Sequence, residues 1–99
     1  MMNVTMNRNG KELTVGIEGR LDTVTAPEFE QKLEPQLEGV EKLILDLSEL
    51  KYISSAGLRV FLSCMKAMDD RGELLVRNVR PEIMDILEVT GFADDLNIE

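Results

Sequence analysis

The chain has 99 residues, of which 43% are hydrophobic and 30% are charged, a balance typical of one globular domain with a single modest core. Its net charge of −8 argues against direct binding to nucleic acid, which requires clustered lysine and arginine side chains. No stretch is long and apolar enough to insert into a membrane. We therefore expect residues 1–99 to form one domain, and the high negative charge predicts a monomer when the protein is alone.

The beginning of the chain is predicted to form an antiparallel pair of strands. Residues 4–6 and 13–17 alternate apolar and polar side chains, which is the period of half-buried strands. Asn9-Gly10 lies between them and favours a two-residue turn of type I′, because both residues tolerate a positive φ.

A helix is predicted to follow this hairpin. Thr25-Ala-Pro-Glu28 has the spacing of a capping box, and Phe29 and Leu33 then mark one helical face. Pro35 should kink this helix or end it early, and Gly39 is the expected stop.

The second half of the chain alternates strands and helices. Residues 42–47 form a nearly continuous apolar run, as expected of a strand covered on both faces. A helix is expected from Ser55 to Gly72, then a strand over residues 74–79 and a last helix from Pro81 to before Gly91. The residues predicted to face the core from these two helices are Leu58, Phe61, Leu62, Met65 and Met68, and then Ile83, Met84 and Leu87.

The order strand-strand-helix-strand-helix-strand-helix predicts a small α/β domain. Helical crossovers between strands imply a mixed, mostly parallel sheet of about four strands, with an antiparallel hairpin at its start and three to four helices.

The composition limits the chemistry that the chain can perform. There is no histidine, which excludes a Ser-His-Asp or Cys-His arrangement, and there is no phosphate-binding glycine loop. The carboxylates lack the spacing of metal sites. We assign no catalytic residue, metal or cofactor and expect a protein that is not an enzyme; an enzyme or nucleotide-binding protein is the least favoured interpretation. The single cysteine, Cys64, indicates a reduced, cytoplasmic location.

Two adjacent serines, Ser54 and Ser55, stand where the strand-to-helix connection begins a helix. A helix N-terminus has unpaired N–H groups and a partial positive charge, so it favours an anion. A serine there can cap the helix, hold a bound phosphate or accept a covalent one. Gly57 is not required for capping, and a small residue at that position would let a partner or a phosphoryl group approach the backbone.

The segment 46–62, which contains both serines, resembles the central motif of STAS domains, specifically the anti-sigma factor antagonists of bacteria. Gly19-Arg-Leu-Asp22, followed by Thr25-Ala26, resembles the family's turn before its first helix. Residues 81–87, with Thr90-Gly-Phe92, resemble the family's last helix and the turn after it.

This resemblance implies partner switching. The unphosphorylated antagonist binds an anti-sigma factor that is also a serine protein kinase, phosphorylation releases it, and a metal-dependent phosphatase of the PP2C type restores it. By position, Ser55 would be the phosphorylation site, with Ser54 as the second choice. The residues that would contact the partner are Asp22, Thr23, Ser54, Ser55, Ala56, Gly57 and Arg59.

Two positions depart from the best-known members of the family. Ser54 stands where they often have aspartate, and Arg59 stands where they often have glycine. Arg59 could pair with a phosphate on Ser55 or with an acid on the partner, or it could simply be solvated. In the alternative interpretation, the domain is a non-phosphorylated scaffold subunit, as in membrane transport complexes, and Ser55 is only a helix cap.

Overall fold

The computed structural model describes residues 2–99 as one α/β domain built on a six-stranded sheet. The strands are β1 (Met2–Asn9), β2 (Glu12–Leu21), β3 (Lys42–Asp46), β4 (Leu50–Ile53), β5 (Glu73–Arg77) and β6 (Asn97–Ile98). The helices are α1 (Thr25–Leu33), the 3₁₀ helix η1 (Glu34–Leu37), α2 (Ser55–Asp69), α3 (Pro81–Val89) and α4 (Phe92–Asp95).

The sheet is mixed, as the order of elements predicts. The strand order is β1-β2-β3-β5-β6; β1 and β2 are antiparallel, and the other neighbours are parallel. The long strand β2 pairs with β3 along its first half and with the short strand β4 near its end. The short strands β4 and β6 add to the strands that the apolar runs identify, because four and two residues are too few to show a periodic pattern.

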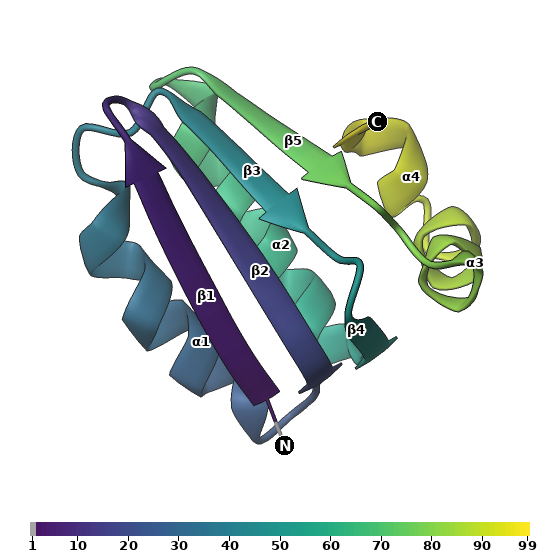
Figure 1. Cartoon of the computed structure of the whole chain (residues 1–99). Helices are drawn as coiled ribbons and strands as arrows, with labels where there is room; N and C mark the ends of the chain where they lie inside the picture. Colours follow the sequence, from purple (N-terminus) through teal and green to yellow (C-terminus); the bar gives the residue numbers. More distant parts are fainter. Residues whose placement is uncertain (1) are drawn as a thin grey trace.

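Helices cover one face of the sheet and leave much of the other face open (Figure 1). Figure 1 shows α1 and α2 on the covered face, with α3 and α4 beyond the carboxyl end of β5. The alternation along β2 places Leu13, Val15 and Ile17 in the core between the sheet and the helices, where all three are buried. The other residues of largest volume in this core are Phe29, Phe61, Leu21, Leu33, Leu43, Leu45, Leu47, Leu50 and Met68.

The hairpin forms, but the predicted turn is wrong by one residue. Asn9 pairs with Glu12, so the two loop residues are Gly10 and Lys11. Gly10 has a φ of +64°, whereas among residues 2–99 the only non-glycine residue with a positive φ is Asn78. A positive φ at the first loop position alone excludes a type I′ turn and matches type II′, which places glycine there.

The start of α1 also differs from the predicted capping box. The N-cap position is Val24, which makes no side-chain cap, and Thr25 is the first helical residue. The expected interruption at Pro35 is confirmed, because α1 ends at Leu33 and continues as η1. Gly39, with a φ of +79°, follows the end of η1 as predicted.

The core-facing sides of two helices are rotated slightly from their predicted positions. In α2, Leu62 is 38% exposed, while Val60 and Cys64 are buried in its place. In α3, Ile83 and Leu87 are buried as expected, but Met84 is only half-buried and Ile86 packs against the core. Short helices at the edge of a layer can place either of two neighbouring residues inward, which sequence spacing alone does not distinguish.

Candidate functional site

The candidate site lies where two neighbouring parallel strands end and α2 begins. Leu21 at the end of β2 is paired with Ile53 at the end of β4. The Ser54 N–H then donates to the Leu21 carbonyl oxygen at 2.9 Å. Asp22, which follows β2, and Ser54, which follows β4, are thereby brought next to each other although they are far apart in the sequence.

The structure separates the roles of the two serines. Ser54 is the N-cap of α2: its backbone is extended, with φ −99° and ψ 177°, and its Oγ accepts from the Gly57 N–H at 3.4 Å. The Leu58 N–H donates to the Ser54 carbonyl oxygen at 2.9 Å and starts the helical ladder. Ser55 is the first helical residue and its side chain is exposed. The cap is therefore already supplied by Ser54, and the Ser55 hydroxyl is left free beside the positive end of the helix.

Gly57 has an internal reason to be glycine. It is buried, and a Cβ on it would lie 2.7 Å from Ile53 Cγ1 and 2.8 Å from the Leu21 carbonyl oxygen. The missing side chain thus lets the first turn of α2 pack onto the ends of β2 and β4. The space it leaves is inside the protein, and not at the surface as the sequence interpretation supposed.

Asp22 holds the connection between β2 and α1. Its Oδ1 accepts from the N–H groups of Val24 and Thr25 at 3.0 Å each, and from the Thr25 hydroxyl at 3.1 Å. The Thr25 Oγ1 in turn accepts from the Asp22 N–H and lies 2.8 Å from the Arg20 carbonyl oxygen. The Thr25 N–H hydrogen bond is the main cause of the lowered pKa of Asp22, with help from Val24, the Thr25 hydroxyl and Arg20.

An exposed aromatic and an exposed aliphatic side chain lie on the same surface, and sequence analysis did not identify either. The Arg20 guanidinium lies 4.3 Å from the centre of the Tyr52 ring, and its Nε is 3.6 Å from Asp22 Oδ2. Tyr52 is 38% exposed and Val24 is 74% exposed. The β-forming pair at positions 52 and 53 could have indicated β4, but no sequence signal marks Val24 as exposed.

The other proposed partner-contact residues differ in exposure. Thr23 is exposed in the turn before α1, and Ala56 is half-buried against the core. Arg59 is exposed one turn after Ser55 on the same side of α2, and within residues 2–99 it forms no ion pair. Next to it runs a groove of about 310 Å³ between α1 and α2. The groove is lined by Ala26, Pro27, Glu30, Ala56, Arg59, Val60 and Ser63.

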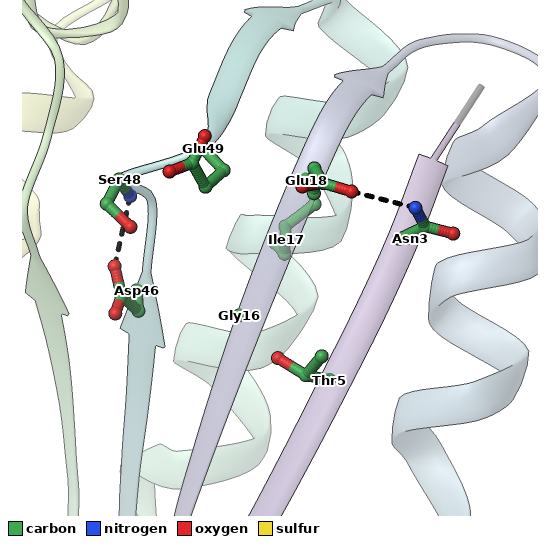
Figure 2. Close-up of a pocket in the computed structure, with 8 residues that line it drawn as sticks. All are labelled: Asn3, Thr5, Gly16, Ile17, Glu18, Asp46, Ser48 and Glu49. Atoms are coloured by element: carbon green, nitrogen blue, oxygen red, sulfur yellow. Dashed lines mark hydrogen bonds between the residues drawn. The ribbon is translucent and has the colours of Figure 1, made fainter.

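A second depression, of about 200 Å³, lies on the open face of the sheet (Figure 2). On one side of the depression the Asn3 side-chain amide donates to Glu18 Oε1 at 2.7 Å, and on the other side the Ser48 N–H donates to Asp46 Oδ1 at 3.0 Å. Figure 2 marks both hydrogen bonds. Burial acts to raise the pKa of Asp46, but hydrogen bonds from Ser48 and Asn78 outweigh it and the pKa is lowered. Within residues 2–99 no three His, Cys, Asp or Glu side chains gather in a way that could hold a metal ion.

Comparison with known proteins identifies the family. The family model described as the STAS domain matches residues 3–99. The chain belongs to the STAS domain family. Two similar relatives are the putative anti-sigma factor antagonist BtrV of Bordetella bronchiseptica and the anti-sigma-B factor antagonist of Bacillus subtilis. This STAS domain is 34% identical to BtrV over 93 residues, which are 92% of this chain and 80% of BtrV. It is 30% identical to the Bacillus subtilis protein over 98 residues, which are 98% of this chain and 90% of that protein.

Solved structures show the same fold as this STAS domain. An anti-sigma factor antagonist from Mycobacterium paratuberculosis has a TM-score of 0.89 at 20% identity, covering 99% of this chain and 85% of that one. The Bacillus cell fate determinant SpoIIAA in its phosphorylated form has a TM-score of 0.76 at 15% identity, covering 98% of this chain and 91% of that one. The murine anion transporter Slc26a9 has a TM-score of 0.75 at 16% identity, covering 90% of this chain and 15% of that one. No helix in the described part of this STAS domain is long and apolar enough to cross a membrane.

Proposed function

We propose that this STAS domain is an anti-sigma factor antagonist in a bacterial partner-switching pathway. Unphosphorylated, it would bind an anti-sigma factor that is also a serine protein kinase, and phosphorylation of Ser55 would release it. The names of its relatives support the role, and the existence of a phosphorylated form of the similar protein SpoIIAA supports the switch. On this proposal the protein is a cytoplasmic regulator and not an enzyme, and a PP2C-type phosphatase would reset it.

The observation that carries the proposal is the division of roles between the two serines. Ser54 caps α2 through its Oγ, and removing or modifying that hydroxyl would disturb the helix itself. Ser55 is exposed and starts the helix without being its cap. A kinase can therefore reach the Ser55 oxygen and transfer a phosphoryl group from ATP to it without breaking the cap.

The charge added at Ser55 fits its surroundings within the domain. A phosphoserine carries about −1.5 to −2 charges at neutral pH and would stand at the positive end of α2. Such an anion stabilises a helix by roughly 0.3–1 kcal/mol. Arg59, one turn later on the same side, is an exposed cation that could approach the phosphate. We therefore expect phosphorylation to leave the fold intact.

Release must then come from the interface with the partner. Among the proposed contacts, Asp22, Thr23, Ser54, Ser55 and Arg59 surround the start of α2, and Tyr52 and Val24 add apolar surface beside them. A phosphate placed in the middle of this surface would oppose any acidic or tightly packed partner group. About 2.7 kcal/mol of such conflict weakens binding roughly a hundredfold, which is enough for a switch.

The site of modification can be tested with the cognate kinase and ATP, followed by mass spectrometry of the peptide that contains both serines. We expect one phosphate on the wild type and on Ser54→Ala, and none on Ser55→Ala. Ser54→Ala serves as the matched control, because it removes the neighbouring hydroxyl and should lower stability by about 1 kcal/mol through loss of the cap. A phosphate on the Ser55→Ala variant would show that the assignment to Ser55 is wrong.

The consequence for binding can be tested with Ser55→Asp. We expect this variant to bind the anti-sigma factor about a hundredfold more weakly than the wild type, while its thermal unfolding midpoint stays within a few degrees of the wild-type value. Titration calorimetry measures the affinity and circular dichroism measures the midpoint. Wild-type affinity, or a variant that no longer folds, would contradict the mechanism.

A second function is favoured by the likeness to the transporter Slc26a9, where a STAS-like fold is one part of a much longer membrane protein. On this reading the domain is a scaffold subunit whose partner binding does not depend on phosphate. An unmodified peptide after incubation with the cognate kinase would favour this second function.

A further inference from the structure

The strand β1 forms one edge of the sheet, and no other strand of residues 2–99 pairs with its outer side. β1 pairs only with β2, over eight consecutive residues and without a register shift. It contains no proline, lysine or acidic residue; its one charged residue is Arg8. The Arg8 guanidinium is bound to the carbonyl oxygens of Gly10, Gln36 and Glu38. Natural edge strands normally carry charges, prolines or bulges that prevent further pairing. β1 has no proline or bulge, and its one charge is held by the carbonyl oxygens that bind Arg8.

The hairpin determines which backbone groups of β1 face outward. Asn9 and Glu12 flank the two-residue loop and form a hydrogen-bonded pair, so Asn9 points its N–H and C=O at β2. Alternation along the strand then turns the N–H and C=O groups of the even-numbered residues away from β2. These residues are Met2, Val4, Met6 and Arg8.

The sequence of β1 is nearly symmetric about its centre. Asn3-Val-Thr-Met-Asn7 reads almost the same in both directions around Thr5. If a second copy pairs antiparallel about a two-fold axis at Thr5, Val4 lies opposite Met6 of the other copy, and Asn3 lies opposite Asn7. The apolar pairs fall on the helix-covered face, where Val4 and Met6 already pack against the core, and the polar pairs fall on the open face. Figure 2 shows Asn3 and Thr5 together on that open face.

This register also supplies hydrogen-bond partners for the backbone groups of β1 that point away from β2. Residues 2, 4, 6 and 8 of one copy would lie opposite residues 8, 6, 4 and 2 of the other, so all outward N–H and C=O groups meet partners. A two-fold interface requires the same surface on both copies to be self-complementary, which β1 is. We propose that two copies of this chain associate through antiparallel pairing of their β1 strands about Thr5, which joins two six-stranded sheets into one.

The pairing goes beyond the proposed switch and is compatible with it. The net charge of −8 opposes self-association in general, but β1 contains no acidic residue and carries one arginine, so this opposition is smaller at β1 than over the whole chain. The exposed residues of α1 are polar or charged apart from Pro27, so the apolar part of the interface comes from β1.

Because the paired strands run in opposite directions, the two Ser55 sites would lie at opposite ends of the dimer. A single pair of strands buries little surface, and we expect a weak dimer that depends on concentration.

Cysteine cross-linking tests the register directly. At the two-fold axis, Thr5 of one copy lies opposite Thr5 of the other in a non-hydrogen-bonded pair. The two Cα atoms of such a pair lie about 4.5 Å apart, which is close enough for a disulfide between cysteines at these positions. Thr5→Cys should form disulfide dimers in a glutathione redox buffer. Asn7→Cys is the matched control, because the two substituted residues would lie roughly 14 Å apart. Cys64 is buried, and the wild type should not cross-link.

We expect at least about tenfold more dimer from Thr5→Cys than from Asn7→Cys, since a disulfide tolerates little deviation in Cα distance. Equal cross-linking of the two variants, or none, would overturn the proposal.

Analytical ultracentrifugation of Val4→Pro supplies an independent measurement. This change removes an outward N–H and spares the bonds to β2, so it should weaken self-association at least about tenfold while the fold is kept. A wild type that sediments as a monomer at every concentration would also overturn it.

Discussion

Small residues at the start of α2 perform three separate tasks although they are adjacent in the sequence. Ser54 caps the helix, Ser55 presents a free hydroxyl, and Gly57 allows the helix to approach the ends of β2 and β4. The close approach also aims Ser55 outward, because the opposite side of the same turn is pressed against Leu21 and Ile53. The exposure of the candidate phosphorylation site therefore depends on a buried glycine two residues away.

Gly57→Ala tests this dependence. The added Cβ would lie within 3 Å of both a side chain and a backbone oxygen, and the backbone oxygen cannot rotate away. We expect the free energy of unfolding to fall by about 1–3 kcal/mol, measured by urea denaturation. Ser55→Ala, an exposed change in the same turn, is the control and should alter it by less than about 0.5 kcal/mol. A Gly57→Ala variant as stable as this control would contradict the packing argument.

At the scale of elements, the junction between β2 and α1 is held by one carboxylate. Asp22 accepts hydrogen bonds from the N–H groups of Val24 and Thr25, which would otherwise lack partners at the start of α1. The Thr25 side chain closes the turn by contacting the Arg20 carbonyl oxygen and the Asp22 N–H. A capping box would pair the N–H groups of Thr25 and Glu28. In the structure Asp22 instead accepts from the N–H groups of Val24 and Thr25, so only the Thr25 N–H is common to both arrangements.

The lowered pKa of Asp22 makes this junction sensitive to acid. Hydrogen bonds from Thr25, then from Val24, lower the pKa in the folded state below the unfolded value of about 3.9. The contribution of Asp22 to stability is therefore complete above about pH 4 and is lost as the pH falls through the folded pKa. We expect Asp22→Ala to be less stable than the wild type at pH 7, and the difference to shrink below pH 4, in urea denaturation at a series of pH values.

Asp22→Asn is the control for this prediction. The asparagine side-chain oxygen can still accept from the same two N–H groups, but the side chain does not titrate in this range. Its stability at pH 7 should lie nearer the wild type than that of Asp22→Ala. A difference between wild type and Asp22→Ala that stays constant from pH 7 to pH 2 would contradict the assigned role.

At the scale of the whole molecule, one core joins the sheet to α1 and α2. The reaction rate of the Cys64 thiol measures how often the helical layer over this core opens. Cys64 is 3% exposed, and burial, with a smaller contribution from Glu30, raises the pKa of its thiol to about 12. A thiol that stays protonated and covered is a poor nucleophile. Its reaction with a thiol reagent requires the helical layer to open.

We expect Cys64 to react with an aromatic disulfide reagent at pH 8 at least about a hundredfold more slowly than an exposed thiol. The rate should rise with urea in parallel with unfolding. The Thr5→Cys variant, mixed with reagent at low protein concentration, provides the exposed thiol in the same chain. Rapid reaction of wild-type Cys64 without urea would show that the layer is open in the native state.

The sequence by itself determined the kinds of elements, their order and the segment that carries the candidate site. Hydrophobic periodicity separates strands from long helices, and the breaks at Pro35 and Gly39 follow from local backbone chemistry. It also restricted the candidate phosphorylation site to two adjacent hydroxyls. The resemblance to the STAS family, carried by three motifs, is confirmed by the family model over residues 3–99.

Only the tertiary structure decided what depends on contacts between distant segments. The pairing of β4 with β2 sets Asp22 beside Ser54, stacks Arg20 on Tyr52 and buries Gly57, and no local pattern contains these contacts. The same packing assigns the cap to Ser54 and leaves Ser55 exposed, whereas the two serines are equally good caps when only the sequence is considered. Propensity and periodicity act over one or two helical turns, but exposure and close approach are set by chain segments about thirty residues apart.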